Sequence, residues 1–210
     1  MRFSVPGSGF WVLVLGSWFF VLSCVLVAQS PQALLNRAVD QFENGQFAES
    51  ARTFDELAKI LPDEAPQLWQ RGIALYYAGR FADCRRQFES HRTVNPDDVE
   101  NAAWHFLCVA RSETPEKAKA ALLPVGPDSR VPMREVYQMF RGVLTPDDVM
   151  KAAGSQPSGL FYAHLYIGLY AEATGRKDLA LTHIKEAASD RYAGVGGYMH
   201  MVARVHARKS

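Results

Sequence analysis

Residues 31–64 read PQALLNRAVDQFENGQFAESARTFDELAKILPDE, and residues 65–98, directly after them, read APQLWQRGIALYYAGRFADCRRQFESHRTVNPDD. Aligned without a gap, the two segments share nine identical residues, where roughly two are expected by chance at ordinary residue frequencies. The identical pairs are Leu34/Leu68, Arg37/Arg71, Gly45/Gly79, Phe47/Phe81, Ala48/Ala82, Arg52/Arg86, Phe54/Phe88, Pro62/Pro96 and Asp63/Asp97. A repeat of this length is typical of a helical solenoid, because one helix pair must stack on another to bury its apolar face.

Each unit predicts two helices joined by a tight turn. The central glycine, Gly45 or Gly79, lets the backbone turn with positive φ at the end of the first helix. A phenylalanine two residues later begins the second helix. Pro62 or Pro96 ends it, because proline cannot continue the hydrogen-bond ladder.

This spacing resembles the tetratricopeptide repeat (TPR), in which a large residue is followed by Gly or Ala, an aromatic residue, Ala, Phe and Pro. These positions hold Leu34, Ala38, Gln41, Ser50, Phe54 and Pro62 in the first unit, and Leu68, Gly72, Leu75, Cys84, Phe88 and Pro96 in the second. The units depart from the pattern in lacking its Trp, and the first has Gln41 at the aromatic position. The resemblance implies that nearly all of these residues pack in the core.

The chain of 210 residues has a net charge of +1, and 48% of its residues are hydrophobic. This size suits one domain, and the balanced charge shows no nucleic-acid footprint. We expect the basic end, residues 204–209, to be a solvated tail.

The N-terminal segment, residues 1–28, is predicted to be a targeting signal, because it is apolar from Phe10 to Ala28 after a positively charged start. Three outcomes stay open. The segment is cleaved after Ala28; or Cys24, in a VLSC stretch that resembles a lipoprotein cleavage box, is acylated; or the segment remains as a membrane anchor. Each predicts an exported chain, periplasmic or anchored facing the periplasm. If the chain is exported, Cys84 and Cys108, which we expect on neighbouring helices, have two interpretations. They form a disulfide, or they are two small buried residues; we favour the second interpretation.

The rest of the chain continues the pattern imperfectly. Thr114-Pro115 and Thr145-Pro146 are helix starts, with a capping hydroxyl before a proline. Residues 156–159 are predicted to end an insert, and residues 194–197 to form a flexible link. The predicted TPR domain spans 31–207, with repeats at 31–64, 65–98, 99–125 and 161–192, an insert at 126–158 and a capping helix at 198–206 that shields the last repeat.

Part of this region resembles bacterial TPR lipoproteins of the NlpI type, in which the insert carries a Pro-x-x-Glu-x-Tyr helix and a Gly-x-Ile-Ser/Thr turn. The matching segments are Val131-Pro132, Glu135-Val136-Tyr137, Gly142-Val143-Leu144-Thr145, Asp148-Val149-Met150, Phe161-Tyr162 and 166–175. The resemblance implies an envelope adaptor that holds peptidoglycan hydrolases, proteases or other envelope machinery together.

Catalytic and metal-binding patterns are missing from the sequence. It contains no HExxH, GxSxG, phosphate-loop or CxxC motif, so we expect no enzyme activity, no cofactor and no metal. A lone histidine on a helix is usually structural, and a site formed by His164, His200 and a nearby acid is a minor alternative.

In TPR proteins the first helices of successive repeats line a concave groove, and its positions map here onto Phe42, Trp69, Ile73, Tyr76, Tyr77, Leu107 and Arg111. Aromatic residues with a polar group, beside an arginine, are common anchors of protein interfaces. Alternatively Trp69 and Tyr76 pack between repeats, and Tyr77 is then the most exposed of the set.

These observations predict an all-α, right-handed TPR solenoid of three to four repeats that acts as a protein-binding adaptor. One alternative is an envelope enzyme or small-ligand-binding protein that uses residues 126–158 with Tyr162, Tyr166 and Tyr170. A second is a self-associating structural protein.

Overall fold

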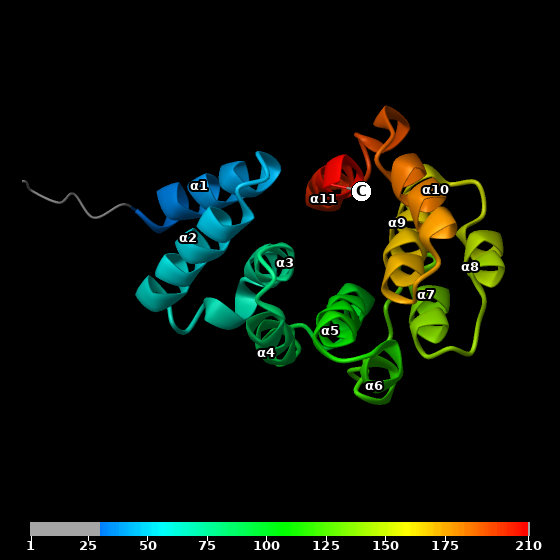
Figure 1. Cartoon of the computed structure of the whole chain (residues 1–210), viewed down its shortest axis with the longest axis horizontal. Coiled ribbons are helices and arrows are strands. Elements are labelled where there is room, and N and C mark those ends of the chain that lie inside the picture. Colours follow the sequence, from blue (N-terminus) through cyan, green and yellow to red (C-terminus); the bar gives the residue numbers. More distant parts are fainter. Residues whose placement is uncertain (1–29, 210) are drawn as a thin grey trace, which may run out of the picture.

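The computed structural model describes residues 30–209, and these residues fold entirely as helices and connecting turns (Figure 1). The predicted all-α class is therefore confirmed for this range. The predicted targeting segment and Cys24 lie outside it. The helices are α1 (Pro31–Glu43), α2 (Phe47–Ile60), α3 (Trp69–Tyr77), α4 (Phe81–His91), α5 (Val99–Ser112), α6 (Pro115–Ala120), α7 (Met133–Phe140), α8 (Pro146–Ala153), α9 (Pro157–Ala173), α10 (Lys177–Ala187) and α11 (Gly197–Lys209), with short 3-10 turns η1 (Ala65–Gln67) and η2 (Asp190–Tyr192).

Helices that follow one another in the chain pack against one another, and together they form a curved array (Figure 1). The most extensive pairings are α9 with α10, α1 with α2, α4 with α5, and α3 with α4. The array bends far enough that α11 returns between its two ends and contacts both α1 and α10. The concave side of the array therefore faces the chain's own C-terminal helix.

The turn glycines adopt the conformation that the repeat predicts. Gly45, Gly79 and Gly175 have φ values of 76°, 75° and 80°, a left-handed region that strains residues with a Cβ atom. Each follows the first helix of a packed pair. The local turn of the repeat is thus confirmed at these three positions.

The two predicted threonine helix starts are also confirmed. The hydroxyl of Thr114 accepts a hydrogen bond from the backbone N–H of Lys117 at the start of α6. Thr145 does the same for Asp148 at the start of α8, and the Asp148 carboxylate accepts from the Thr145 backbone N–H in return. These contacts satisfy N–H groups that a helix terminus leaves unpaired.

Residues 156–159, where the insert is predicted to end, are the start of a helix, because Pro157 is the first residue of α9. Proline is well tolerated there, since its missing N–H has no partner in the first turn. Among residues 30–209, no helix is both long enough and apolar enough to cross a membrane.

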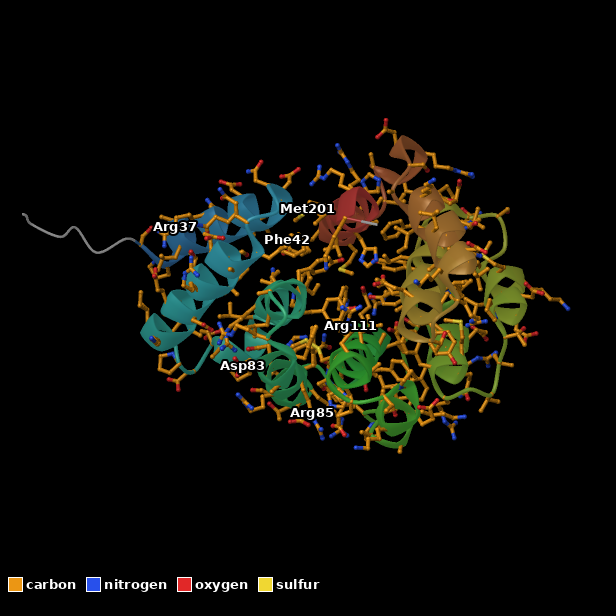
Figure 2. The ribbon with its side chains drawn as sticks, viewed as in Figure 1. Arg37, Phe42, Asp83, Arg85, Arg111 and Met201 are labelled. Carbon is orange, nitrogen blue, oxygen red and sulfur yellow. A yellow bond between two sulfur atoms is a disulfide. The ribbon has the colours of Figure 1, made fainter. Side chains whose placement is uncertain are left out.

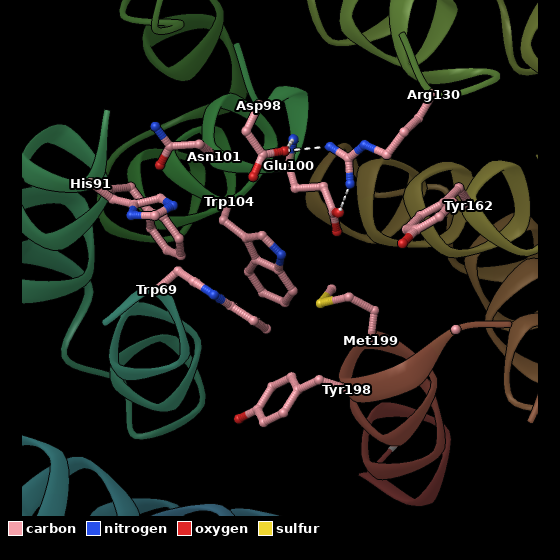
Figure 3. A pocket seen from close by; sticks show the side chains of 12 residues that line it. Trp69, His91, Asp98, Glu100, Asn101, Trp104, Arg130, Tyr162, Tyr198 and Met199 are labelled. Atoms are coloured by element: carbon pink, nitrogen blue, oxygen red, sulfur yellow. Dashed lines mark hydrogen bonds and ion pairs between the residues drawn. The ribbon is translucent and has the colours of Figure 1, made fainter. Parts of the chain in front are cut away.

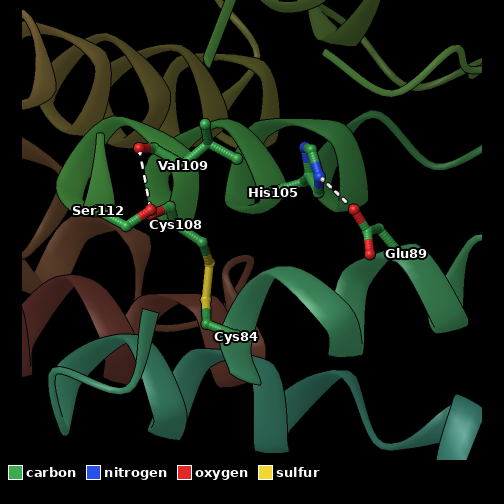
Figure 4. Close-up of a disulfide and its surroundings, with 6 residues drawn as sticks. All are labelled: Cys84, Glu89, His105, Cys108, Val109 and Ser112. Atoms are coloured by element: carbon green, nitrogen blue, oxygen red, sulfur yellow. Dashed lines mark hydrogen bonds and ion pairs between the residues drawn. A yellow bond between two sulfur atoms is a disulfide. The ribbon is translucent and has the colours of Figure 1, made fainter. Parts of the chain in front are cut away.

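Cys84 of α4 and Cys108 of α5 form a disulfide (Figure 4). Both residues are fully buried, so the burial part of the favoured interpretation is confirmed. The expectation that they are unbonded is wrong. The reason is geometric: consecutive helices bring the two Cα atoms to 5.9 Å, within the range that a disulfide spans.

A candidate binding cavity on the inner face

Helix α11 occupies much of the inner face through aromatic contacts. The ring of Tyr198 lies 4.9 Å from that of Trp69 and 6.2 Å from that of Phe42, measured between centroids. In Figure 2, Arg111 lies on the inner side of the array, whereas Arg37 and Arg85 lie on its outer side. The helix expected to cap only the last repeat therefore spans the concavity as well.

The C-terminal end of α11 is held by a buried histidine. His206 Nδ1 lies 2.7 Å from the Tyr77 hydroxyl, and His206 Nε2 lies 2.5 Å from a Glu172 carboxylate oxygen. Tyr77 is only 6% exposed, so its expected exposure is wrong. The expected solvated tail is wrong for His206, which is buried. The other basic residues of this end, Arg204, Arg208 and Lys209, are exposed on α11, and Arg208 donates a hydrogen bond to the Glu43 carbonyl. Tertiary packing against α3 and α9 explains both corrections.

A cavity of about 310 Å³ lies at the N-terminal end of α11 (Figure 3). It is enclosed by side chains from α3, α4, α5, α9 and α11 and from the loop before α7. The lining residues are Trp69, Phe88, His91, Asp98, Glu100, Asn101, Trp104, Arg130, Tyr162, Gly196, Tyr198 and Met199. Trp69, Arg130 and Tyr162 are partly exposed and form its open rim.

One guanidinium and the carboxylates of Asp98 and Glu100 form the polar wall, and a third carboxylate, that of Asp128, pairs with the same guanidinium behind it. Arg130 donates to Asp98 at 2.5 Å, to Glu100 at 2.5 Å and to Asp128 at 2.6 Å. Asp128 also accepts from the Val99 backbone N–H, so it ties the loop to the start of α5. Although burial alone lowers the pKa of Arg130, its carboxylate partners raise the pKa above its usual value. The guanidinium therefore stays charged.

Glu100 is the most constrained acid of this cluster. Its side chain is 14% exposed and accepts hydrogen bonds from Arg130 and from the Tyr166 hydroxyl. Burial raises the pKa of Glu100 above its ordinary value, and the neighbouring Asp98 raises it further, against the attraction of Arg130. The carboxylate is thus held in a site that does not fully compensate its charge.

Three buried polar atoms at the cavity residues have no hydrogen-bond partner within residues 30–209. They are Trp104 Nε1, Asn101 Oδ1 and the Tyr198 hydroxyl oxygen. Trp104 and Asn101 are 1% and 4% exposed, so bulk water does not reach them freely. Buried polar atoms are nearly always hydrogen-bonded, because leaving one unpaired costs free energy. Figure 3 shows the Trp104 indole directed into the cavity.

The predicted groove residues are divided among three places. Trp69 lines the cavity just described, whereas Tyr76, Tyr77 and Arg111 line a smaller cavity of about 190 Å³ at the other end of α11. The remaining three residues, Phe42, Ile73 and Leu107, are buried in the core. Partner binding by this set stays a prediction.

The two histidines of the minor catalytic alternative each have another near neighbour. His164 Nδ1 lies 3.1 Å from His183 Nδ1, and His200 Nε2 lies 3.0 Å from the Ser189 carbonyl. Within the described range, no group of three or more His, Cys, Asp or Glu side chains is placed to hold a metal ion.

Sequence reasoning missed most of the cavity wall. Glu100, Asn101 and Trp104 lie on α5, and their i, i+3 and i+4 spacing was the available signal. Arg130 and Tyr198 offered no such signal, because their roles depend on contacts across the array.

No protein-family model matches this sequence, and no curated protein matches it significantly. What the chain binds is therefore inferred from its own side chains.

Replacing Glu100 by glutamine is expected to change how stability depends on pH. Because the folded pKa of Glu100 is raised, the wild-type fold loses stability as pH rises above the ordinary glutamate value of 4.5. The free energy of unfolding of Glu100→Gln, minus that of wild type, should therefore increase with pH. Urea unfolding from about pH 4 to about pH 8 measures this difference.

The matched control is Glu64→Gln, at an exposed position before η1. A difference for Glu100→Gln that changes with pH no more than that of this control would show that the Glu100 carboxyl is not disfavoured in the fold.

Proposed function

We propose that this chain is an exported, non-catalytic adaptor of the cell envelope, built as a TPR-type solenoid similar to the NlpI-type lipoproteins. Repeated helix pairs with a left-handed glycine between their members, at Gly45, Gly79 and Gly175, support the TPR part of this proposal. The buried disulfide supports export, since disulfides persist in oxidising compartments. The NlpI-type resemblance favours envelope hydrolases or proteases as partners.

The observation that carries the binding function is the cavity at the N-terminal end of α11. It combines aromatic walls with buried polar atoms, Trp104 Nε1 and Asn101 Oδ1, that have no hydrogen-bond partner within residues 30–209. Apolar concave sites with a few fixed polar groups are the usual form of binding sites. The volume of about 310 Å³ accepts one anchoring residue of a partner rather than a whole helix.

Site-specific photo-crosslinking tests the adaptor role. A photoreactive amino acid at Trp69, on the rim, should capture a discrete partner in intact cells. The same probe at Arg85, on the outer side, is the control. Equal products from both positions, or none from the rim, would contradict the proposal.

A second candidate is a small-ligand-binding protein, which the same cavity favours because Arg130 comes from the predicted insert and Tyr162 from the helix after it. This function predicts a saturable small-molecule complex without a crosslinked protein partner. A screen against hydrolase substrates separates binding from turnover. Activity lost in His164→Ala would instead favour an enzyme.

A further inference from the structure

The polar wall of the cavity carries more negative than positive charge. Arg130 is shared by Asp98, Glu100 and Asp128, so three carboxylates face one guanidinium. Carboxylates removed from water need compensating positive charge, and one arginine supplies a third of it. This excess of negative charge would repel an anionic ligand, whereas it would attract a cationic one.

The apolar walls favour a cation as well. Trp69, Trp104, Tyr162 and Tyr198 all line the cavity, and Tyr162 already stacks on the guanidinium of Arg130 at 5.6 Å. The faces of Trp and Tyr rings attract cations through the ring quadrupole. Aromatic rings beside carboxylates therefore suit an organic ammonium group with an apolar body.

One unpaired atom on α5 defines a neighbouring group of the ligand. Within residues 30–209, Trp104 Nε1–H is a donor without an acceptor. Glu100 and Trp104 are one helical turn apart and share one helix face, whereas the Asn101 amide points away from Glu100, toward His91 (Figure 3). A ligand that meets Glu100 and Trp104 carries N–H donors and a carbonyl oxygen close together.

We propose that this cavity binds a protonated primary amine whose adjacent carbon bears a carbonyl group, as at the N-terminus of a peptide or in an amino-acid amide. Glu100 accepts from the ammonium, and the Trp104 indole donates to the carbonyl oxygen. The aromatic rings surround the side chain. This inference rests on the proposed binding function and names the chemistry of its occupant.

The size of the cavity agrees with such a group. About 310 Å³ corresponds to roughly ten waters at their liquid volume, so a single ordered water does not fill it. Entry is open at the rim, where Trp69 and Tyr162 are partly exposed. One residue with its terminal amine fits these limits.

The test titrates the full chain, kept in mild detergent, with four probes. Phenylalaninamide carries the amine and the carbonyl, and N-acetylphenylalaninamide lacks the positive charge. 2-Phenylethylamine lacks the carbonyl, and phenylalanine has a carboxylate in place of the amide. Binding is followed by calorimetry and by the Trp104 indole N–H resonance, assigned from Trp104→Phe. We expect phenylalaninamide to move this resonance and to bind at least about tenfold more tightly than each other probe.

Glu100→Gln should weaken phenylalaninamide binding by about tenfold or more, while the control Glu64→Gln should leave it unchanged. In Trp104→Phe, the preference for phenylalaninamide over 2-phenylethylamine should disappear. Any one of three results would overturn the proposal. The acetylated probe binds as tightly as phenylalaninamide, Glu100→Gln binds phenylalaninamide as tightly as Glu64→Gln does, or no probe binds at millimolar concentration.

A peptide amide with an N-terminal phenylalanine distinguishes the two sources of this chemistry. Binding as tight as that of phenylalaninamide identifies a peptide N-terminus, and binding of phenylalaninamide alone identifies a free small amine; both support the amine site. Rim crosslinks to a partner without any amine preference would overturn this inference and leave the adaptor function standing. Amine binding without any rim crosslinks would contradict the adaptor function and leave the amine site standing.

Discussion

Replacing Phe88 by alanine is expected to lower the free energy of unfolding by about 3–5 kcal/mol. The ring is 1% exposed and lies on α4 against two elements. It stacks on Trp104 with centroids 6.4 Å apart, and it fills the space over Gly72, where an added Cβ would come within 2.6 Å of it. Truncation leaves a void that these neighbours cannot close, because Trp104 is fixed by its own packing.

Urea unfolding of the full chain measures this loss, with Phe54→Ala as a parallel variant at the equivalent position of the first unit. Phe54 is also buried, so we expect a loss in the same range. Ile60→Ala, at a residue 51% exposed, is the control and should change stability by no more than about 0.5 kcal/mol. A Phe88→Ala result as small as this control would show that the repeat does not place Phe88 in the core.

The helix pairs around Phe54 and Phe88 could be predicted because their signals are local. A glycine and a phenylalanine two residues later fix where one helix ends and the next begins, and the apolar spacing fixes which face is buried. The closing proline is a weaker signal, because Pro62 lies two residues after the end of α2, whereas α4 ends at His91, five residues before Pro96. The same reasoning located the helix starts at Thr114 and Thr145, where the capping side chains lie within three residues of their partners.

The path of α11 could not be predicted, since it depends on partners distant in the sequence. His206 meets Tyr77 across 129 residues, and nothing local specifies that pairing. An amphipathic face shows that a helix packs against something but not against what. The charged wall of the cavity has the same origin, because Arg130 reaches Asp98 and Glu100 only after the loop before α7 folds back on α5.

The error over Cys84 and Cys108 was of another kind. Their positions on neighbouring buried helices were expected, but burial fits a thiol and a disulfide equally well. Only the spatial distance between the two residues decides between these states.

Removing this disulfide is expected to lower the free energy of unfolding by about 2–4 kcal/mol. The bond joins residues 24 apart in sequence, and opening it lets the unfolded chain explore conformations that the closed loop forbids. The double variant Cys84→Ala/Cys108→Ala removes the bond without leaving buried thiols. Alanine is also the residue that the repeat pattern favours at the position of Cys84. Urea unfolding of wild type, with and without reductant, and of the double variant measures the effect.

Reductant provides the internal control, because it should shift the unfolding midpoint of wild type and leave that of the double variant unchanged. Cys24 remains in both proteins, so a shift confined to wild type belongs to the Cys84–Cys108 bond. Equal midpoints for oxidised and reduced wild type would mean that the bond adds no stability. The loop entropy would then be offset in the folded state, and the link between α4 and α5 would depend on packing around Trp104 rather than on the covalent bond.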